Sequence, residues 1–225
     1  MLIPKIIHQT WKTTNVPFDI FEKKWIKSWK KFHPDWQYKL WTDKDIRNLV
    51  KKHYKWFLKT YDNYDAPIKR VDAGKYIILD HEGGLYADLD YECLKNFEPL
   101  LLDNICFLSC EYESLAGPVC SNALMASVSK HPFWEEVFKQ LPKNKDGHIL
   151  NAAGPFFLTT VFNQHAGNSV MFLKDKKLFP WKYTDGLHKF SGKIYPESYA
   201  IHYSLVTWMN QNTKGNEWIP PPKLT

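Results

Sequence analysis

The sequence predicts a single α/β domain in which a mixed, partly parallel sheet is flanked by helices. Short apolar runs alternate with longer segments of helical periodicity, and this alternation is typical of a sheet with parallel strands. The length of 225 residues suits one large domain. The composition, 44% hydrophobic and 24% charged, is that of a globular chain. A chain of this length buries roughly 70% of its unfolded surface, so it needs no disulfide or structural metal to fold.

The net charge of +6 indicates no particular partner. The lysines are scattered in short pairs, such as residues 23–24 and 51–52, and form no basic run. A nucleic-acid-binding surface needs clustered cations, so we expect no nucleic-acid partner. The four cysteines include no C-x-x-C pair, which argues against a zinc knuckle. Cys106 and Cys110 lie in an apolar stretch and are expected to be buried thiols.

No feature of the sequence indicates secretion or membrane insertion. The first residues are too short an apolar start for a signal peptide. The chain contains no transmembrane segment, because it has no apolar run of about 18 residues. It also lacks an Asn-X-Ser/Thr site. These observations predict a soluble, cytoplasmic protein.

The first expected strand, residues 3–7, is followed by polar and aromatic side chains. In open α/β sheets, ligands bind outside the carboxyl ends of the strands. Gln9, Thr10 and Trp11 are therefore candidates for ligand contact. For Trp11, a place in the core is an equally good interpretation of the local sequence.

The next elements follow from periodicity. Residues 21–32 carry Phe and Trp on one face at helical spacing, residues 36–41 alternate as a strand does, and residues 43–61 predict a second helix. A third helix over residues 66–80 has Pro67 in its first turn. Gly83 and Gly84 then permit positive φ and end it.

The remaining elements are a short buried strand over residues 85–87 and several later segments. We expect a strand at 105–109, a strand or helix at 122–128, and helices at 132–140 and 154–163. The final third of the chain gives no clear pattern.

Asp88 and Asp90 follow the short strand directly. Residues two apart in an extended chain point the same way, so the two carboxylates would share one face. Such a pair needs a compensating cation or protonation. Mg²⁺ and Mn²⁺ take oxygen ligands and leave positions open for substrate phosphates. The pattern therefore favours a metal site, with a solvated turn as the alternative.

Asp72 and Lys75 lie three residues apart on the predicted third helix, hence on one face. Asp72 falls among the core-facing positions, and a buried carboxylate needs partners. Either the two residues form a local ion pair, or Asp72 accepts hydrogen bonds from sugar hydroxyls beside a cation near a diphosphate. Gly84 would let the backbone approach the ligand closely.

Three blocks of the sequence together resemble a known family: residues 3–11 (IPKIIHQTW), 70–76 (RVDAGKY) and 83–90 (GGLYADLD). They are similar to the glycosyltransferases of family 32, whose sugar-binding region contains the DXD motif. These enzymes are related to the glucosylating domains of large clostridial toxins. Later pieces agree with the resemblance: residues 121–127, 131–134 and 153–155, His202, and Thr207 with Trp208.

The resemblance implies a GT-A type fold, a Rossmann-like mixed sheet flanked by helices, in one domain over residues 1–225. Residues 1–110 would form the nucleotide-sugar half, and residues 111–225 the half that binds the acceptor. The implied activity is that of a retaining glycosyltransferase that moves a hexose from a nucleotide-diphosphate sugar to a glycan or other hydroxyl acceptor. A UDP-sugar is the favoured donor and GDP-mannose the other candidate.

The resemblance also implies residue roles. The metal, Mn²⁺ or Mg²⁺, would be held by Asp90, Asp88 and His202. The catalytic set would be Asp72, Asp88, Asp90 and Lys75, and Trp11 would stack on the nucleotide base. The substrate site would contain Gln9, Thr10, Trp11, Asp72, Gly84, Tyr86, Asn122 and Trp208. Because the leaving phosphate can take the acceptor's proton, no separate base is required; Asp72, Glu111 and Glu113 are the available helpers.

The chain departs from the family at two positions. Lys75 stands where the family usually has Arg, and a lysine offers a point charge in place of a planar fork. Thr207 stands before Trp208, where the family usually has Ser. The yeast-type members carry an N-terminal anchor, whereas this chain starts near its first strand, which suggests a bacterial or viral type.

Two other functions are compatible with parts of the sequence. A DxD phosphatase would need a small hydroxylated residue where Glu92 stands, and its motif would lie near the N-terminus. A nucleotide-sugar or carbohydrate-binding module of the same fold without catalysis is the second alternative. The presence of Asp72, Asp88 and Asp90 argues against such a module.

Overall fold

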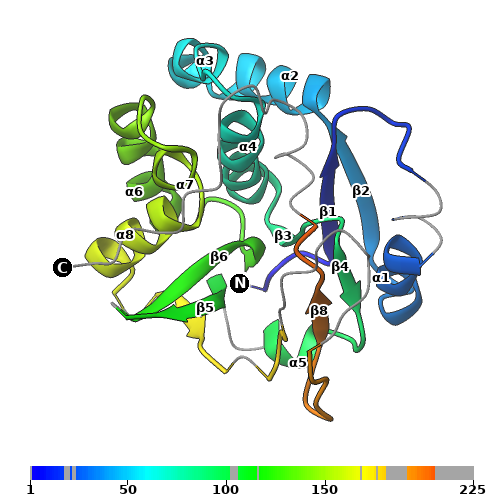
Figure 1. The fold of residues 1–225 in the computed structure, drawn as a ribbon. Helices are drawn as coiled ribbons and strands as arrows, with labels where there is room; N and C mark the ends of the chain where they lie inside the picture. The colour runs from blue at the N-terminus through cyan, green and yellow to red at the C-terminus, as the bar shows by residue number, and fades with distance from the viewer. Residues whose placement is uncertain are drawn as a thin grey trace.

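The computed structural model describes residues 2–17, 21, 24–101, 106–115, 117–167, 169–175, 177–180 and 192–205. Within these residues a six-stranded sheet forms the centre of the molecule, in the order β2-β1-β3-β6-β5-β7 (Figure 1). Its strands are β1 (Ile6–Trp11), β2 (Gln37–Thr42), β3 (Gly84–Ala87), β5 (Cys106–Ser114), β6 (Gly117–Ser127) and β7 (Met171–Leu173). A separate two-stranded sheet pairs β4 (Tyr91–Cys93) with β8 (Ala200–His202).

Helices separate most of these strands, as the alternation in the sequence predicts. They are α1 (Lys27–Phe32), α2 (Asp43–His53), α3 (Lys55–Asp62), α4 (Pro67–Glu82), α5 (Glu98–Leu101), α6 (Pro132–Gln140), the 3-10 helix η2 (Leu141–Asn144), α7 (Ile149–Ala152) and α8 (Pro155–His165). The expected fold class is confirmed: a mixed sheet flanked by helices.

The sheet is parallel in one half and mainly antiparallel in the other. β1 pairs in parallel with both β2 and β3. Helical crossovers join these strands in sequence, so their carboxyl ends meet at one edge. β6 runs antiparallel to β3 and β5. The first strand extends to Trp11, further than expected, so Gln9 and Thr10 lie inside the strand instead of beyond it.

The helix expected over residues 43–61 is interrupted, which corrects that prediction. The chain leaves helical geometry at Tyr54, with φ −126° and ψ 46°, and α3 begins at the next residue. Tyr54 is buried, and its hydroxyl donates a 2.6 Å hydrogen bond to Asp80 on α4. Tertiary packing of this one aromatic residue therefore overrides the helical periodicity of the segment.

The segment over residues 122–128, left open between strand and helix, is part of the long strand β6. Together with β5 it forms an antiparallel hairpin whose pairing shifts register near Cys110. All four cysteines are buried thiols, as expected for Cys106 and Cys110.

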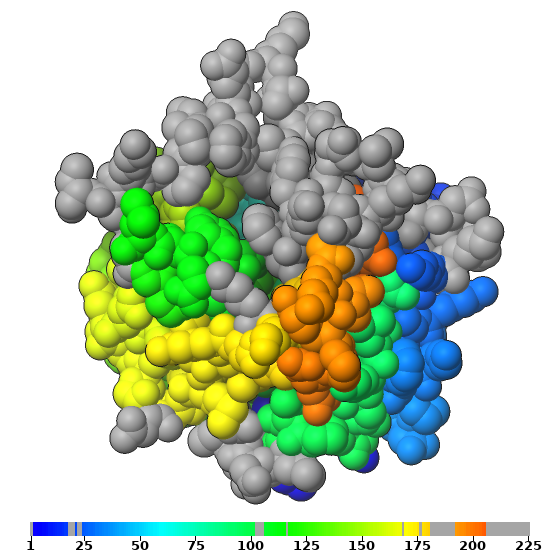
Figure 2. All heavy atoms as spheres, turned by 60° about the horizontal axis from the view of Figure 1, so that its bottom comes forward, coloured from blue at the N-terminus to red at the C-terminus, as the bar shows by residue number. Residues whose placement is uncertain are grey.

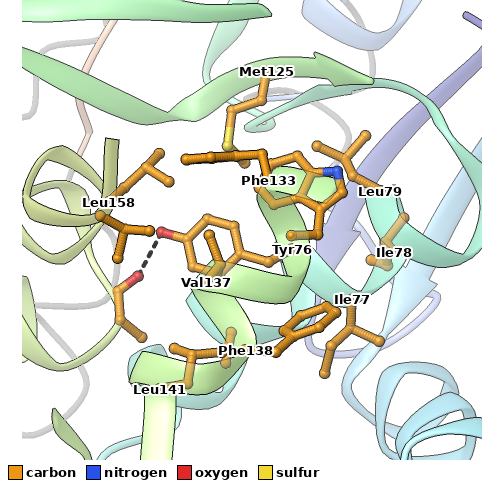
Figure 3. Packing of buried hydrophobic residues seen from close by; sticks show 14 of the residues in the cluster. Tyr76, Ile77, Ile78, Leu79, Met125, Phe133, Val137, Phe138, Leu141 and Leu158 are labelled. Atoms are coloured by element: carbon orange, nitrogen blue, oxygen red, sulfur yellow. Dashed lines mark hydrogen bonds between the residues drawn. The ribbon is translucent and has the colours of Figure 1, made fainter. Parts of the chain in front are cut away.

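The helix α4 is buried along most of its length, and its packing sets the position of the functional residues. Tyr76 stacks on Trp134 of α6 with ring centroids 5.8 Å apart. Its hydroxyl donates a 2.7 Å hydrogen bond to the carbonyl of Ala153 (Figure 3). These contacts fix the rotation of α4, and Asp72 lies one turn before Tyr76 on the same face.

A segment late in the chain, residues 192–202, packs back against β4. Figure 2 shows residues 192–203, in orange, between the yellow segment that follows β7 and the green residues of β4 and α5. The backbone N–H of Tyr199 donates to the carbonyl of Leu178 at 2.7 Å, and its carbonyl accepts from Leu94 at 2.8 Å. This docking brings β8 beside β4. No helix in the described part of the chain is long and apolar enough to span a membrane.

Candidate functional site

Charged side chains from three elements gather where β3 ends. Asp88 and Asp90 lie in the connection from β3 to β4, as the end of a buried strand allows. α4 contributes Asp72 and Lys75, and β8 contributes His202. The structure therefore brings together the predicted catalytic residues at the carboxyl edge of the parallel strands.

Lys75 joins Asp72 to Asp88. Its Nζ lies 3.0 Å from Asp72 Oδ1 and 3.0 Å from Asp88 Oδ1. Lys75 is 3% exposed, so this ammonium has little contact with water. Burial alone would lower the pKa of Lys75, but the neighbouring Asp88, Tyr86 and Asp72 raise it well above its usual value. Lys75 is thus a fixed positive charge between two carboxylates.

Burial strongly affects the carboxylate of Asp72. Burial raises the pKa of Asp72, while Lys75 lowers it, Asp88 raises it and the amide of Asn122 lowers it. The result is a pKa of about 6. Asp72 can therefore exchange a proton, or accept one from a hydroxyl group, near neutral pH.

Asp88 is held by a chain of polar groups from β1 and β3. Tyr86 donates its hydroxyl hydrogen to Asp88 Oδ1 at 2.6 Å, and Thr10 Oγ1 lies 2.8 Å from the same hydroxyl. The side-chain amide of Gln9 donates to the backbone carbonyl of Asp88 at 3.2 Å. Of the predicted residues, Gln9 and Tyr86 thus contact Asp88 and Thr10 contacts Tyr86, which is itself fully buried.

Asp90 and His202 form a pair beside the group of Asp72, Lys75 and Asp88. His202 Nε2 lies 3.4 Å from Asp90 Oδ1, and the backbone N–H of Leu205 donates to Asp90 Oδ2 at 2.8 Å. Burial raises the pKa of Asp90, but His202 and this hydrogen bond outweigh it and lower the pKa overall. Burial likewise lowers the pKa of His202, but Asp90 and Glu111 raise it above its usual value.

Tyr91 and Glu111 flank His202, and Ser121 in turn contacts Glu111. Tyr91 stacks on its ring with centroids 4.2 Å apart and an interplanar angle of 10°. Glu111 Oε1 lies 3.5 Å from His202 Nδ1, and Ser121 donates its hydroxyl hydrogen to Glu111 Oε2. Sequence reasoning proposed Glu111 only as a helper and gave no role to Tyr91. The only signal for Tyr91 was its place after Asp90, because the pairing of β4 with β8 is a long-range contact.

The predicted metal ligands are divided between the group around Lys75 and the pair Asp90–His202. Asp88 is turned toward Lys75 and Tyr86, whereas Asp90 and His202 are adjacent. Among the described residues, no three His, Cys, Asp or Glu side chains are arranged to hold a metal ion. A divalent cation bound with a diphosphate takes only one or two protein ligands. Asp90 and His202 fit that requirement, because Asp90 Oδ1 and His202 Nε2 face each other at 3.4 Å.

The other predicted substrate residues are placed as follows. Trp11 is partly buried: its ring lies 5.0 Å from Phe21, and its indole N–H donates to the carbonyl of Asn15 at 3.1 Å. Asn122 is buried on β6 near Asp72. Gly84 lies at the start of β3, away from the carboxylates, and faces β1. Trp208 and Thr207 lie outside the described residues.

Comparison with known proteins finds similarity to glycosyltransferases. Residues 21–107 match a family model described as a glycosyltransferase sugar-binding region containing the DXD motif. The matched region includes Asp72, Lys75 and both aspartates that follow β3.

Curated relatives match over most of the chain. A mannosyl phosphorylinositol ceramide synthase of Saccharomyces cerevisiae is 39% identical over 73% of this chain and 43% of its own length. Inositol phosphoceramide mannosyltransferase 2 of Schizosaccharomyces pombe is 32% identical over 94% of this chain and 59% of its own. An uncharacterised glycosyltransferase of Acanthamoeba polyphaga mimivirus is 24% identical over 92% of this chain and 84% of its own length. The chain thus spans about half the length of the yeast relatives.

Solved structures show the same fold at low sequence identity. The glycosyltransferase PaToxG matches with a TM-score of 0.53 and 20% identity, over 72% of this chain and 70% of that one. Mouse xyloside xylosyltransferase 1 matches with a TM-score of 0.52 and 12% identity, over 88% of this chain and 97% of that one. The expected GT-A type architecture is confirmed.

Proposed function

Since the chain belongs to the family of glycosyltransferases whose sugar-binding region contains the DXD motif, we propose that it transfers a mannosyl residue from a nucleotide-diphosphate sugar to a hydroxyl acceptor. The observation that carries the proposal is the adjacency of a charged group of three residues and a charged pair at the carboxyl edge of the sheet. Lys75 bridges Asp72 and Asp88, and His202 faces Asp90. The names of the relatives favour GDP-mannose over the UDP-sugar expected from the sequence.

The same names suggest the class of acceptor. Several relatives are named for mannosyl transfer to inositol phosphoceramide, and they match 71–94% of this chain. We therefore propose a phosphoinositol-containing glycolipid as the first acceptor to test, with a soluble glycan as the second.

In the proposed mechanism, Asp72 accepts hydrogen bonds from hydroxyl groups of the donor sugar, and Lys75 places a positive charge near the diphosphate. Tyr86 and Gln9 hold Asp88 in place. Asp90 and His202 would hold a divalent cation, Mn²⁺ or Mg²⁺, which neutralises charge on the departing diphosphate. The acceptor hydroxyl attacks from the face that the diphosphate leaves, with retention of configuration, and the leaving phosphate takes its proton.

The test is a donor screen on the purified chain. GDP-mannose, UDP-glucose and UDP-galactose are incubated with Mn²⁺ or with EDTA, with and without inositol phosphoceramide in detergent micelles, and nucleotide release is measured. We expect release from GDP-mannose that requires Mn²⁺ and increases with the acceptor. Binding of a nucleotide-sugar without any turnover would instead support the binding module.

The matched variant is Asp90→Asn, which preserves the shape of the side chain. Because it removes a proposed metal ligand, we expect at least about a hundredfold loss of Mn²⁺-dependent turnover, on the order of one lost transition-state contact. The melting temperature, measured in parallel, distinguishes a loss of the cation site from a loss of folding. Full activity in this variant would disprove the metal role.

A further inference from the structure

Glu111 lies on the opposite side of His202 from Asp90. The two ring nitrogens each face a carboxylate: Nε2 faces Asp90 Oδ1 at 3.4 Å, and Nδ1 faces Glu111 Oε1 at 3.5 Å. The three residues come from separate elements, namely the β3–β4 connection, β5 and β8. The imidazole is therefore enclosed between two carboxylates that the sequence separates widely.

The position of Glu111 is itself fixed. Its Oε2 accepts the hydroxyl hydrogen of Ser121, a fully buried residue on the neighbouring strand β6. Only 14% of the Glu111 side chain is exposed, so Oε1 is held toward His202 and away from solvent. The stacked ring of Tyr91 fixes the plane of the imidazole. Stacking fixes the plane of the ring but leaves open which nitrogen faces which neighbour. Glu111 supplies this second constraint.

A neutral histidine has one N–H and one lone pair, and only the lone pair binds a cation. Because a carboxylate faces each ring nitrogen, binding of a cation at Nε2 would leave the one remaining proton on Nδ1, beside Glu111. Here Nδ1 is buried without a hydrogen-bond partner in the described residues, so it can donate only toward Glu111. We infer that Glu111 is a positioning residue that holds His202 with Nε2 facing Asp90 and the bound cation. This inference rests on the proposed function.

The geometry favours this role over two others. As a direct metal ligand, Glu111 would have to lie on the Asp90 side of the ring, whereas its Oε1 faces Nδ1. As a base for the acceptor, it would have to present a free carboxylate oxygen, but Oε2 accepts from Ser121 and Oε1 is directed at His202 Nδ1.

The experiment is a double-mutant cycle on Mn²⁺ binding. The dissociation constant of Mn²⁺ is measured by electron paramagnetic resonance with saturating GDP, and in parallel with UDP. The proteins compared are the wild type, Glu111→Ala, His202→Ala and the double variant. We expect Glu111→Ala to weaken Mn²⁺ binding about 10- to 100-fold in the wild-type background. In the His202→Ala background, Glu111→Ala should change the Mn²⁺ dissociation constant by no more than about twofold, because the imidazole that Glu111 positions is gone.

Two further variants complete the design. Glu111→Gln keeps the shape and one acceptor oxygen, so we expect it to recover part of the affinity. It also serves as the test protein if Glu111→Ala does not fold, as judged by circular dichroism. Glu135→Ala removes an exposed carboxylate on α6 and should leave Mn²⁺ binding unchanged. In turnover assays, excess Mn²⁺ should restore most of the kcat of Glu111→Ala.

The outcomes separate the two proposals. If the wild type binds no Mn²⁺ with either nucleotide, the proposed metal is wrong and the role of Glu111 is wrong with it. If the wild type binds Mn²⁺ and Glu111→Ala binds it equally well, only the positioning role is overturned. An equal loss in both backgrounds, or a kcat that excess Mn²⁺ does not restore, would also overturn it.

Discussion

Lys75 shows how one residue determines the electrostatics of the site. The family usually carries an arginine at this position, and the sequence predicted a weaker, less directional contact with the diphosphate. In the structure, the lysine bridges Asp72 and Asp88, and a single ammonium offsets two carboxylates. Removing one partner of a buried ion pair is costly, because the opposite charge remains without compensation.

The first prediction concerns Lys75→Met. We expect the free energy of unfolding at pH 8 to fall by about 3 kcal/mol. The loss should be smaller at pH 5. Burial already raises the pKa of Asp72 to about 6, and losing Lys75 raises it further, so at pH 5 the folded variant binds a proton there. Urea denaturation at both pH values measures this, with the exposed Lys51→Met as control. A loss that does not depend on pH would contradict this account.

A second prediction concerns His8, which is buried in β1. Its Nε2 donates to the carbonyl of Gly83 at 2.8 Å, and its Nδ1 accepts from the indole of Trp41 at 3.0 Å, so the folded state requires the neutral ring. Burial lowers the pKa of His8 to about 4, below the value near 6.5 expected when the chain is unfolded. The unfolded chain therefore binds the proton first as the pH falls.

The stability that depends on neutral His8 is fully present above pH 6.5 and is lost as the pH falls toward 4. The loss amounts to about 3 kcal/mol, at about 1.4 kcal/mol per pKa unit. In His8→Gln, whose amide does not titrate, the decline of stability over this range should be shallower. Thermal unfolding across the pH range tests this, and curves that stay parallel would show that His8 is not responsible.

Among the secondary-structure elements, those with local signals were predicted well and those that depend on distant packing were not. Periodicity and Pro67 located α4, and Gly83 with Gly84 located its end, because these signals lie within the segment itself. The short strand β8 carries no such signal. It exists because the chain docks against Leu94 and Leu178, and this long-range contact places His202 beside Asp90. The contacts between Glu111, Ser121 and Tyr91 escaped prediction for the same reason.

The close packing at the start of β3 gives a prediction for Gly84, with Gly117 as the comparison. Gly84 has φ +99°, and a Cβ there would lie 2.6 Å from the carbonyl oxygen of Ile6 and 2.9 Å from His8 Nε2. Gly117 has a comparable φ of +113° but no atom within 4 Å of the added Cβ. We expect Gly117→Ala to cost about 1–2 kcal/mol from backbone strain alone. Gly84→Ala should exceed about 4 kcal/mol or prevent folding, because β1 would have to move away from β3.

Urea denaturation of the two variants compares these values directly, and circular dichroism identifies a variant that does not fold. Equal losses of unfolding free energy in the two variants would mean that the close approach of β1 to Gly84 does not add to the cost of the Gly84 substitution. Only the Gly84 variant should also disturb the site, since β3 leads directly into Asp88.

In the molecule as a whole, the site joins parts of the chain that are far apart in sequence. Asp72, Lys75, Asp88 and Asp90 come from the N-terminal half, while Glu111, Asn122 and His202 come from the C-terminal half. The proposed boundary near residue 110 thus separates two groups of residues that lie together in the candidate site. A ligand that contacts both groups is expected to stabilise the whole fold.

The last prediction follows from this linkage. A ligand that binds only the folded state at about 100 times its dissociation constant adds about 2.7 kcal/mol to the free energy of unfolding. We expect GDP with Mn²⁺ to raise the melting temperature in one cooperative transition, and GDP with EDTA to raise it less. His202→Ala should remove the additional stabilisation by Mn²⁺ and keep the part due to nucleotide alone, because the nucleotide contacts proposed for Trp11 lie in the other half. Stabilisation by Mn²⁺ that survives in His202→Ala would mean that the cation is held without the C-terminal half.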